Sequence, residues 1–429
     1  MRDLASRLRS IVRQDAERQR SSPQVRELTY VADVEGGHDT ERTASALGGA
    51  VHGSDASACV VVDRVWSADD RLGHRRVAGW TIDRDAPIAL FDRRLEATPD
   101  WADHVVFFDV ETTGLSGGAG TLAFLAGCGW FESDAFRIRQ FFLSGPAGER
   151  AMLEALGEIF DDASLLVTFN GRSFDVPVME MRWAFHRRAT PTDGLPHFDM
   201  LPPARRLWGI DAEQNCSLTS LERSVLGVHR HGDVPGFEIP TRYFQFLRTG
   251  DATTVEGVLE HNRQDVISLA AVTSYALGLA RGGPDVCRVP GEQLALGRLY
   301  ERVADVERAA RAYELASAPS TGDRAVRCQA LARLAELRRR AQRYEEAAEV
   351  WRDVLALSEA DVAATPMGRR ATEALAIHHE HRARDLDAAR RYAETLTSSS
   401  TGGAAARARH RLQRLERKLE KVEGSRIFD

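Results

Sequence analysis

An almost wholly apolar run, VVFFDV at residues 105–110, constrains the fold more than any other feature of this 429-residue chain. Such a run is typical of a strand that is covered on both faces of a sheet. It breaks at two acids one residue apart, Asp109 and Glu111, before a glycine-rich segment. Because an unpaired buried carboxylate is costly, groups from elsewhere in the chain must stabilise this acidic pair.

Strands and helices alternate after this run as far as residue 280. The patterns predict two more strands, then a helix, a strand, a helix, a short strand and further helices. The predicted strands lie at 121–130, 135–143, 164–170 and 196–201, and the first two helices at 149–160 and 174–188. A β-rich segment precedes them, so we expect one α/β domain over residues 61–280.

The chain before this domain has a different character. Residues 1–28 are rich in arginine and have the pattern of an amphipathic helix instead of a secretory signal. Residues 29–60 are rich in Gly, Ser, Ala and Thr, which favours a loose linker. We therefore expect residues 1–60 to form an N-terminal helix and a flexible linker.

Composition limits the class of protein. Hydrophobic residues make up 43% of the chain and charged residues 28%, as in soluble globular proteins. The apolar stretches are shorter than the roughly 18 residues that cross a membrane. Five scattered cysteines have no zinc or disulfide spacing, which favours a reducing cytoplasm. We expect a cytoplasmic protein of two or three domains without membrane contact.

A repeated pattern marks the C-terminal region. Paired alanines followed by an aromatic residue recur as AARAY at 309–313, AAEVW at 347–351 and AARRY at 388–392. The intervals are slightly longer than the ~34 residues of a tetratricopeptide repeat. The pattern favours a tetratricopeptide-like helical solenoid over residues 288–429, the alternative being a plain helical bundle with alanine-rich packing faces.

Two later motifs supply partners for the first acidic pair. NGRSFD places Asp175 five residues after Asn170, and HNRQDVISL places His261 and Asp265 four residues apart on one helix face. Asp175 and Asp265 could therefore converge with Asp109 and Glu111 to give four carboxylates. Hard divalent cations prefer such carboxylate-rich sites, and two ions can stabilise both reacting oxygens of phosphodiester hydrolysis.

These motifs resemble a known superfamily. FDVETTGL, NGRSFD and HNRQDVISL resemble the three exonuclease motifs of the DEDD 3′→5′ exonucleases. The connectors HFDMLPPARRLWG, LTSLERSVLGV and DVPGFEIPTRYF are similar to those of the YprB-like ribonuclease H-like branch. The resemblance covers about residues 60–280. It implies an α/β RNase H-like fold, a mixed sheet with flanking helices, followed here by the all-α repeat domain.

The resemblance also implies a role for each site residue. Asp109 would bridge two Mg²⁺ or Mn²⁺ ions, Glu111 and Asp265 would complete the inner site, and Asp175 would hold the outer ion. His261 would orient or deprotonate the attacking water, and two residues would contact the substrate, namely Thr112 and Asn170. His261 stands at the spacing where tyrosine-type members carry tyrosine, since histidine-type members place their histidine one residue earlier.

Three other segments allow more than one interpretation. Asp199 and His197 either lie beside the metals or serve the structure, with Arg205 or Arg206 as a partner for Asp199. The DVPG segment at 233–236 predicts first a turn, the other interpretation being a wall of the substrate site. The basic stretch 404–421, with seven cations against two acids, is either a solvated helix face or a nucleic-acid contact.

The whole pattern predicts a metal-dependent 3′→5′ exonuclease acting on a single-stranded or frayed 3′ end of DNA or RNA. The helical repeats would bind a protein partner. Two alternatives remain open at this point: a structure-specific endonuclease with the same site, and a repeat-based adaptor with a non-catalytic nuclease-like domain.

Overall fold

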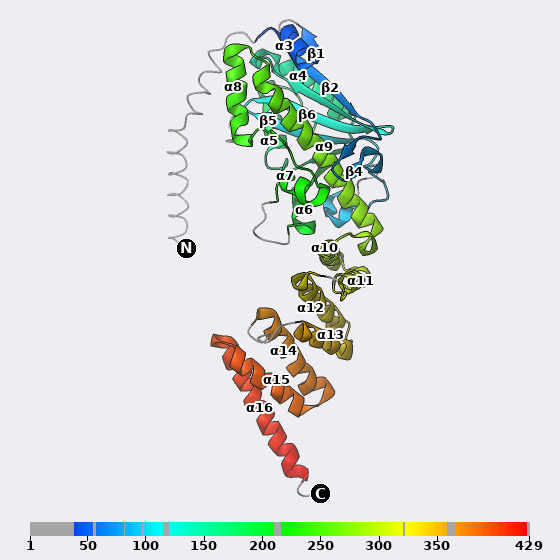
Figure 1. Cartoon of the computed structure of the whole chain (residues 1–429), viewed down its shortest axis with the longest axis vertical. Helices are drawn as coiled ribbons and strands as arrows, with labels where there is room; N and C mark the ends of the chain where they lie inside the picture. Colours follow the sequence, from blue (N-terminus) through cyan, green and yellow to red (C-terminus); the bar gives the residue numbers. More distant parts are fainter. Residues whose placement is uncertain are drawn as a thin grey trace. The chain divides into compact units, whose positions relative to one another are not determined.

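The computed structural model describes most of the chain, with short gaps. The described residues are 38–54, 57–80, 82–96, 98, 100–114, 120–209, 216–320, 322–357 and 365–426. The helix predicted at 1–28 lies outside them. The described residues form two compact units (Figure 1). The first unit contains the described residues of Met1–Arg205 and Asp211–Gly278. The second unit contains those of Arg206–Ile210 and Leu279–Asp429.

A seven-stranded mixed sheet forms the centre of the first unit, in the order β1-β2-β7-β6-β5-β8-β9. β5 pairs in parallel with β8, and β8 with β9, whereas the other neighbours are antiparallel. The strands are β1 (Ala50–Ser54), β2 (Ser57–Trp66), β5 (Val105–Thr112), β6 (Ala123–Glu132), β7 (Ala135–Phe142), β8 (Leu165–Thr168) and β9 (His197–Asp199). A separate hairpin joins β3 (Arg71–Leu72) and β4 (Arg75–Arg76). The predicted α/β fold class is confirmed.

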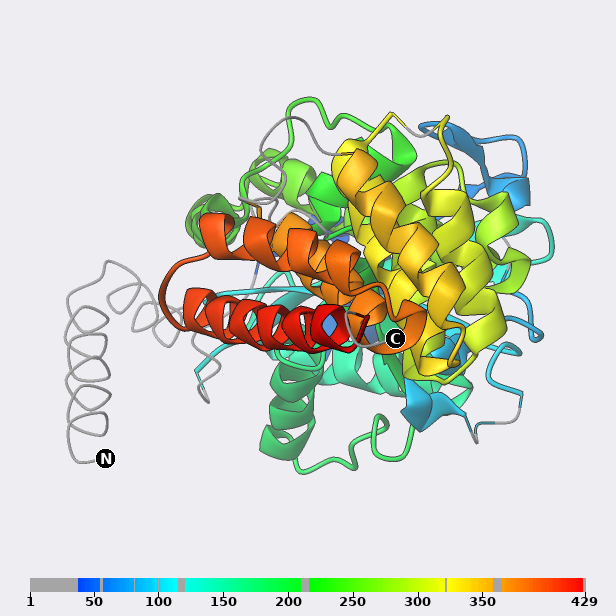
Figure 2. The same ribbon diagram turned by 90° about the horizontal axis from the view of Figure 1, so that it is seen from below.

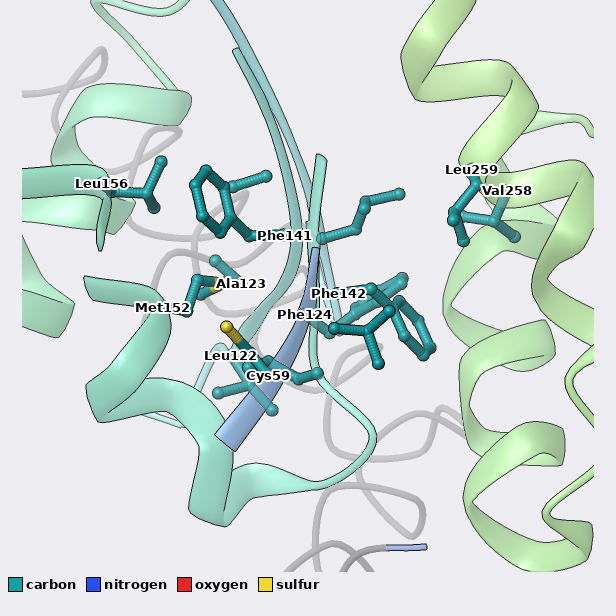
Figure 3. Close-up of a cluster of buried hydrophobic side chains, with 14 of the residues drawn as sticks. Cys59, Leu122, Ala123, Phe124, Phe141, Phe142, Met152, Leu156, Val258 and Leu259 are labelled. Carbon is teal, nitrogen blue, oxygen red and sulfur yellow. The ribbon is translucent and has the colours of Figure 1, made fainter. Parts of the chain in front are cut away.

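Helices cover both faces of this sheet, as the apolar β5 requires. On one face lie α4 (Glu149–Asp161) and α5 (Asp175–Phe185), which are joined by a hydrogen bond from the Trp183 indole to Leu153 O. On the other lie α8 (Ile239–Thr249) and α9 (Thr253–Gly282). Figure 3 shows the side chains of α4 and α9 entering the core from opposite sides of the strands. The short helices α6 (Leu201–Leu207) and α7 (Leu218–Leu221) precede α8.

Two glycines of β6 let α9 approach the sheet closely. A Cβ atom on Gly127 would lie 2.3 Å from Asn262 Oδ1, and one on Gly129 would lie 2.6 Å from a methyl carbon of Val266. Both partners belong to α9. Glycine within a strand often marks such a close approach. The GCG sequence of β6 therefore sets the distance between α9 and the neighbouring strand β5.

The predicted flexible linker is wrong for its described part. Thr40–Leu47 forms helix α3, and β1 and β2 form a hairpin that extends the sheet from β7. Ala44, Leu47 and Val60 pack into the main hydrophobic core. The segment looked like a linker because small residues separate its few apolar ones. Strand pairing stabilises it through backbone hydrogen bonds, which do not depend on side-chain size.

The second unit is entirely helical in its described residues. Its helices are α10 (Pro290–Arg302), α11 (Val306–Ala316), α12 (Arg324–Arg340), α13 (Tyr344–Ala356), α14 (Pro366–His378), α15 (Leu386–Ser399) and α16 (Gly402–Arg426). Each helix contacts the next one, and α12 also contacts α10 and α14. Figure 2 shows α15 and α16 side by side. The three alanine–aromatic motifs lie in α11, α13 and α15. The predicted all-α region is confirmed.

Part of the basic stretch in α16 has a structural partner. Glu380, in a π-helical turn after α14, is buried and binds three cations of α16, namely Arg411, Arg414 and Lys418. These contacts hold α16 against the end of α14. In the described part of the chain, no helix is long and apolar enough to cross a bilayer.

Candidate active site

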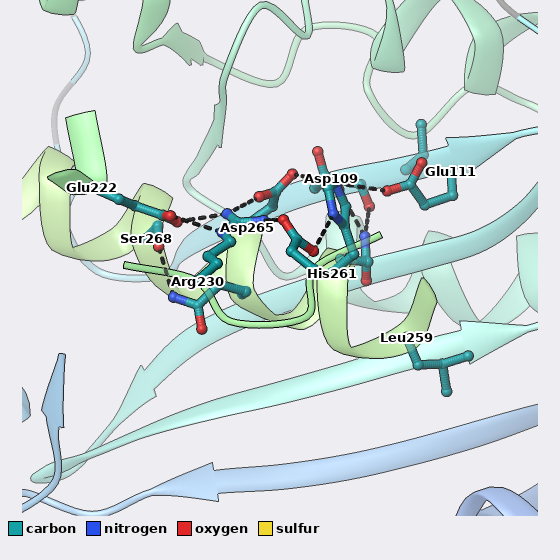
Figure 4. A network of polar contacts seen from close by, with 12 residues as sticks. Asp109, Glu111, Glu222, Arg230, Leu259, His261, Asp265 and Ser268 are labelled. Atoms are coloured by element: carbon teal, nitrogen blue, oxygen red, sulfur yellow. Dashed lines mark hydrogen bonds and ion pairs between the residues drawn. The ribbon is translucent and has the colours of Figure 1, made fainter. Parts of the chain in front are cut away.

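Asp109 and Glu111 lie near the carboxyl end of β5, on the face covered by α9. Residues two apart on a strand share a face, so both side chains meet α9. The Asn262 amide donates to Asp109 Oδ2 at 2.8 Å and to Asp109 O at 3.1 Å, and Asn262 Oδ1 accepts a 2.8 Å hydrogen bond from Gln140. A register shift in the pairing of β5 with β6 falls between Glu111 and Thr112. Figure 4 shows this corner of the site.

Asp175 reaches the same place from the other side of the strand. It is the first residue of α5, and its Oδ1 accepts the backbone N–H of Val110 at 3.1 Å. Burial raises the pKa of Asp175 to about 7, against the lowering effect of this and one other backbone hydrogen bond, with a further increase from the charges of Asp199 and Asp265.

The acids destabilise one another in their ionised forms. Burial raises the pKa of Asp109 well above its ordinary value, and the charges of Asp265, Asp175 and Glu111 raise it further. The pKa of Glu111 is raised for the same first reason, and then by Asp265 and Asp175. These carboxylates therefore form one electrostatically coupled cluster.

His261 and Asp265, one helical turn apart on α9, complete the predicted set. His261 Nε2 lies 3.9 Å from Glu111 Oε1 and 3.5 Å from Asp265 Oδ2, so it stands between two carboxylates without a close hydrogen bond to either. The structure thus brings Asp109, Glu111, Asp175, His261 and Asp265 to one end of the sheet.

Two residues that we did not predict also belong to this place. Asp233, interpreted from the sequence as part of a turn, pairs with His261: its Oδ1 lies 2.8 Å from Nδ1. Arg230, whose side chain is only 7% exposed, binds Asp265 and donates to Asp233 Oδ2 at 3.1 Å. The sequence signals were the polar cluster HRHGD, which ends at Asp233, and the connector DVPGFEIPTRYF, which begins there.

Thr112 and Asn170 lie beside this cluster, where local structure explains both residue types. The Thr112 hydroxyl donates to Gly114 O at 3.0 Å and stabilises the bend of the chain after β5. Asn170 has a φ of 68°, a left-handed conformation that asparagine tolerates better than most residues. Their contacts with a substrate stay predictions.

Asp199 serves the local structure, one of the roles that the sequence allowed. Its carboxylate accepts three backbone N–H groups: those of Asn170 at 2.8 Å, Leu201 at 3.0 Å and Arg172 at 3.3 Å. It therefore holds the loop that leads into α5 and sets where Asp175 begins that helix. His197 Nε2 lies 2.7 Å from the Thr168 hydroxyl, and burial lowers its pKa.

The donor chemistry fits a hard divalent cation. Carboxylate oxygens are the ligands that Mg²⁺ and Mn²⁺ prefer, and the acids of this site lie close enough for the charge of one to raise the pKa of another, after the larger effect of burial. Among the described residues, however, no three His, Cys, Asp or Glu side chains are grouped closely enough to hold one ion. Asn262, Val110 N–H and Arg230 instead hold separate carboxylates.

Sequence comparison assigns the first unit to a known fold. Residues 106–277 match the RNase_H superfamily (RNase_H_2). The first unit has an RNase H-like fold. A 174-residue stretch is 39% identical to "Uncharacterized protein YprB" of Bacillus subtilis (strain 168), covering 40% of this chain and 41% of that relative. The chain thus matches about two fifths of the relative's length.

A solved structure also resembles part of the chain, more distantly. The family B DNA polymerase of the hyperthermophilic archaeon Pyrobaculum calidifontis aligns at 14% identity and a TM-score of 0.31, over 49% of this chain and 29% of the polymerase. Both values are too low to support an inference. The RNase H-like assignment therefore rests on the family match and on the sheet itself.

Proposed function

We propose that this protein is a metal-dependent 3′→5′ exonuclease that hydrolyses phosphodiester bonds at a 3′ end of nucleic acid. One observation carries the proposal: β5, α5 and α9 of an RNase H-like unit bring four carboxylates and one imidazole to one end of the sheet. Their sequence motifs resemble those of the DEDD exonucleases, which supports the 3′→5′ direction.

The carboxylates of Asp109, Glu111, Asp175 and Asp265 would hold two Mg²⁺ or Mn²⁺ ions. When bound, such ions stabilise the attacking and leaving oxygens of an in-line displacement. Burial first, and then the charges of the neighbouring acids, raise the pKa values of Asp109 and Glu111, and a bound cation would relieve the repulsion among these acids.

The other groups of the site act on water and substrate. His261 presents Nε2 between Glu111 and Asp265, where it can accept a proton from the attacking water. Thr112 ends β5 and Asn170 follows β8, at the carboxyl ends where such sheets usually bind ligands, and both would contact the terminal nucleotide.

The C-terminal helices would form a separate tetratricopeptide-like module for a protein partner. Helix α12, the first of its pair, contacts the first helices of the preceding and following pairs, as in a solenoid of stacked repeats. The three alanine–aromatic motifs occupy the second helix of each pair. We place the nuclease domain at 61–280 and extend it by α3 and β1, and the repeats at 288–429.

The test is hydrolysis of 3′- and 5′-labelled single-stranded DNA, duplex DNA and single-stranded RNA. Activity should require Mg²⁺ or Mn²⁺, disappear in EDTA and return when either ion is added. Ca²⁺ should bind yet support little turnover, because its looser coordination misplaces the reacting groups. Full activity in chelator would refute the metal-dependent mechanism.

Two further measurements separate the alternatives. Circular or 3′-blocked substrates should resist an exonuclease, and cleavage of them would identify an endonuclease. Calorimetric titration with Mn²⁺ should show binding that Asp109→Asn weakens. A wild-type chain that binds no Mn²⁺ and cleaves no substrate would instead be an adaptor with a non-catalytic nuclease-like domain.

A further inference from the structure

The segment from Glu222 to Asp233 holds a chain of buried and half-buried ionic groups against α9. The Glu222 side chain has no exposed area, and it accepts two hydrogen bonds from Arg230, at 2.6 Å to Oε1 and 2.7 Å to Oε2. The same guanidinium binds Asp233 and Asp265. Such a two-point pairing fixes the plane of the guanidinium as well as its position.

Packing fixes the end of this segment on the same helix. Val234 is 2% exposed, and its Cγ2 would lie 2.8 Å from a Cβ atom on Gly257. Gly257 is one helical turn before His261 on α9. A side chain at 257 would therefore push the segment away from the histidine. Because glycine has no side chain at this position, Asp233 can approach the imidazole.

We infer that Asp233 is a positioning residue, which turns His261 so that Nδ1 faces Asp233 and Nε2 faces Glu111 and Asp265. The Nδ1 to Oδ1 distance of 2.8 Å is a full hydrogen bond, whereas the two Nε2 distances are not. With its proton on Nδ1, a neutral imidazole carries its lone pair on Nε2 and points it into the site.

Arg230 anchors this arrangement from behind. It donates to Asp233 Oδ2, the oxygen that does not face His261, and it binds Asp265 Oδ1, which leaves Oδ2 on the His261 side. The His261 hydrogen bond and then the Arg230 guanidinium outweigh the effect of burial and lower the pKa of Asp233. One buried ion pair, Glu222 with Arg230, thus sets the orientation of both functional residues of α9.

This inference rests on the proposed function, and its test separates the two. Hydrolysis rates and Mn²⁺ affinity are compared for wild type, Asp233→Asn, Asp233→Glu, His261→Ala and the Asp233→Asn/His261→Ala pair. Asp233→Asn should lower kcat by about 10- to 100-fold, the usual effect of losing a carboxylate that orients a histidine. KM and the Mn²⁺ affinity measured by calorimetry should stay close to the wild-type values, and Asp233→Glu should recover part of kcat.

The double variant gives the decisive comparison. If Asp233 acts through His261, its removal should cost nothing further once His261 is alanine, since residues that act as a unit are not additive. Independent, multiplied losses, or a fall in Mn²⁺ affinity as large as the fall in kcat, would overturn the inference. A wild-type protein that hydrolyses nothing overturns the proposed function instead.

Two more variants keep the test free of folding artefacts. Gly257→Ala keeps the Asp233 and His261 side chains but pushes Val234, and with it Asp233, away from α9, so it should lower kcat in the same way. Unchanged kcat in a folded Gly257→Ala protein would also contradict the inference. Glu260→Gln, which removes an exposed acid next to His261 that pairs with Arg263, is the matched control and should leave kcat unchanged.

Discussion

Gly127→Ala tests how the fold holds Asp109. Gly127 is paired with Asp109 in the β5–β6 register. An added Cβ would lie 2.3 Å from Asn262 Oδ1 and 3.0 Å from both Asn262 Cγ and Val266 Cγ2. The backbone at 127 has no positive φ, so alanine fits the chain and the whole effect is steric. Asn262 is fully buried and must move away from Asp109.

The cost follows from the contacts that are lost. Forcing an extra methyl group into a packed core costs about 1–3 kcal/mol. Displacing Asn262 also breaks the hydrogen bonds to Asp109 and from Gln140, and buried polar groups left without partners cost ~1–3 kcal/mol. We expect a loss of about 2–5 kcal/mol, which for a unit of this size lowers Tm by ~5–15 °C.

Thermal unfolding and oligonucleotide hydrolysis measure the two consequences, with two matched controls. Gly129→Ala overpacks the same strand, but the nearest atoms to its added Cβ belong to Val266 and Phe136 instead of Asn262, so it should lower Tm and retain more activity. Gly157→Ala adds a methyl group to open space in α4 and should be neutral or slightly stabilising, by up to about 1 kcal/mol.

Two results would refute this reasoning. A Gly127→Ala protein with wild-type Tm and activity would mean that Asn262 does not fix Asp109. Equal losses of activity for Gly127→Ala and Gly129→Ala at equal Tm would mean that general overpacking, and not the Asn262 contact, disturbs the site.

Three more predictions concern charge and modularity. Asp175→Asn should stabilise the EDTA-treated protein at pH 8 by ~1–4 kcal/mol. The reason is that a pKa raised from 3.8 to about 7 destabilises the ionised acid by about 1.36 kcal/mol for each pKa unit. A lower Tm of the variant in EDTA would show instead that the charge of Asp175 stabilises the fold. A chain ending at residue 285 should stay folded and cleave short oligonucleotides within several-fold of the wild-type rate, although Trp208 loses its hydrogen bond to Glu292. A folded but inactive product would show that the nuclease unit depends on the helical repeats. Glu380→Gln should lower the free energy of unfolding by about 1–2 kcal/mol and speed hydrogen exchange in α16, because Arg414 and Lys418 hold the pKa of Glu380 at about 2 against the effect of burial. The wild-type protein should lose the same contribution as the pH falls from about 4.5 to 2. Unchanged hydrogen exchange in the variant would refute this role of Glu380.

The features predicted correctly were those set by local pattern. The apolar run of β5, the period-2 placement of its acids and the amphipathic helices gave the α/β order and most element positions. His261 and Asp265 could be placed on one face because helical spacing is local. These signals need no knowledge of which distant segments meet.

The missed features depend on contacts between distant segments. Asp233 meets His261 across 28 residues, and Arg230 meets Asp265 across 35, so nothing in the DVPG sequence separates a plain turn from a site residue. The small residues before Ser54 resemble a linker until β2 pairs with β7. Cations of α16 resemble a free basic face until Glu380 accepts three of them.

The acidic pair that breaks β5 is stabilised only in part by the protein. Asn262 offers Asp109 one neutral amide, and the single guanidinium of Arg230 is already shared by Glu222, Asp233 and Asp265. Burial, and then the charges of the neighbouring acids, raise the pKa values of Asp109 and Glu111. The buried hydrogen bonds orient these carboxylates without neutralising them, and this arrangement supports our proposal of divalent cations, whose charge and oxygen preference match such a cluster.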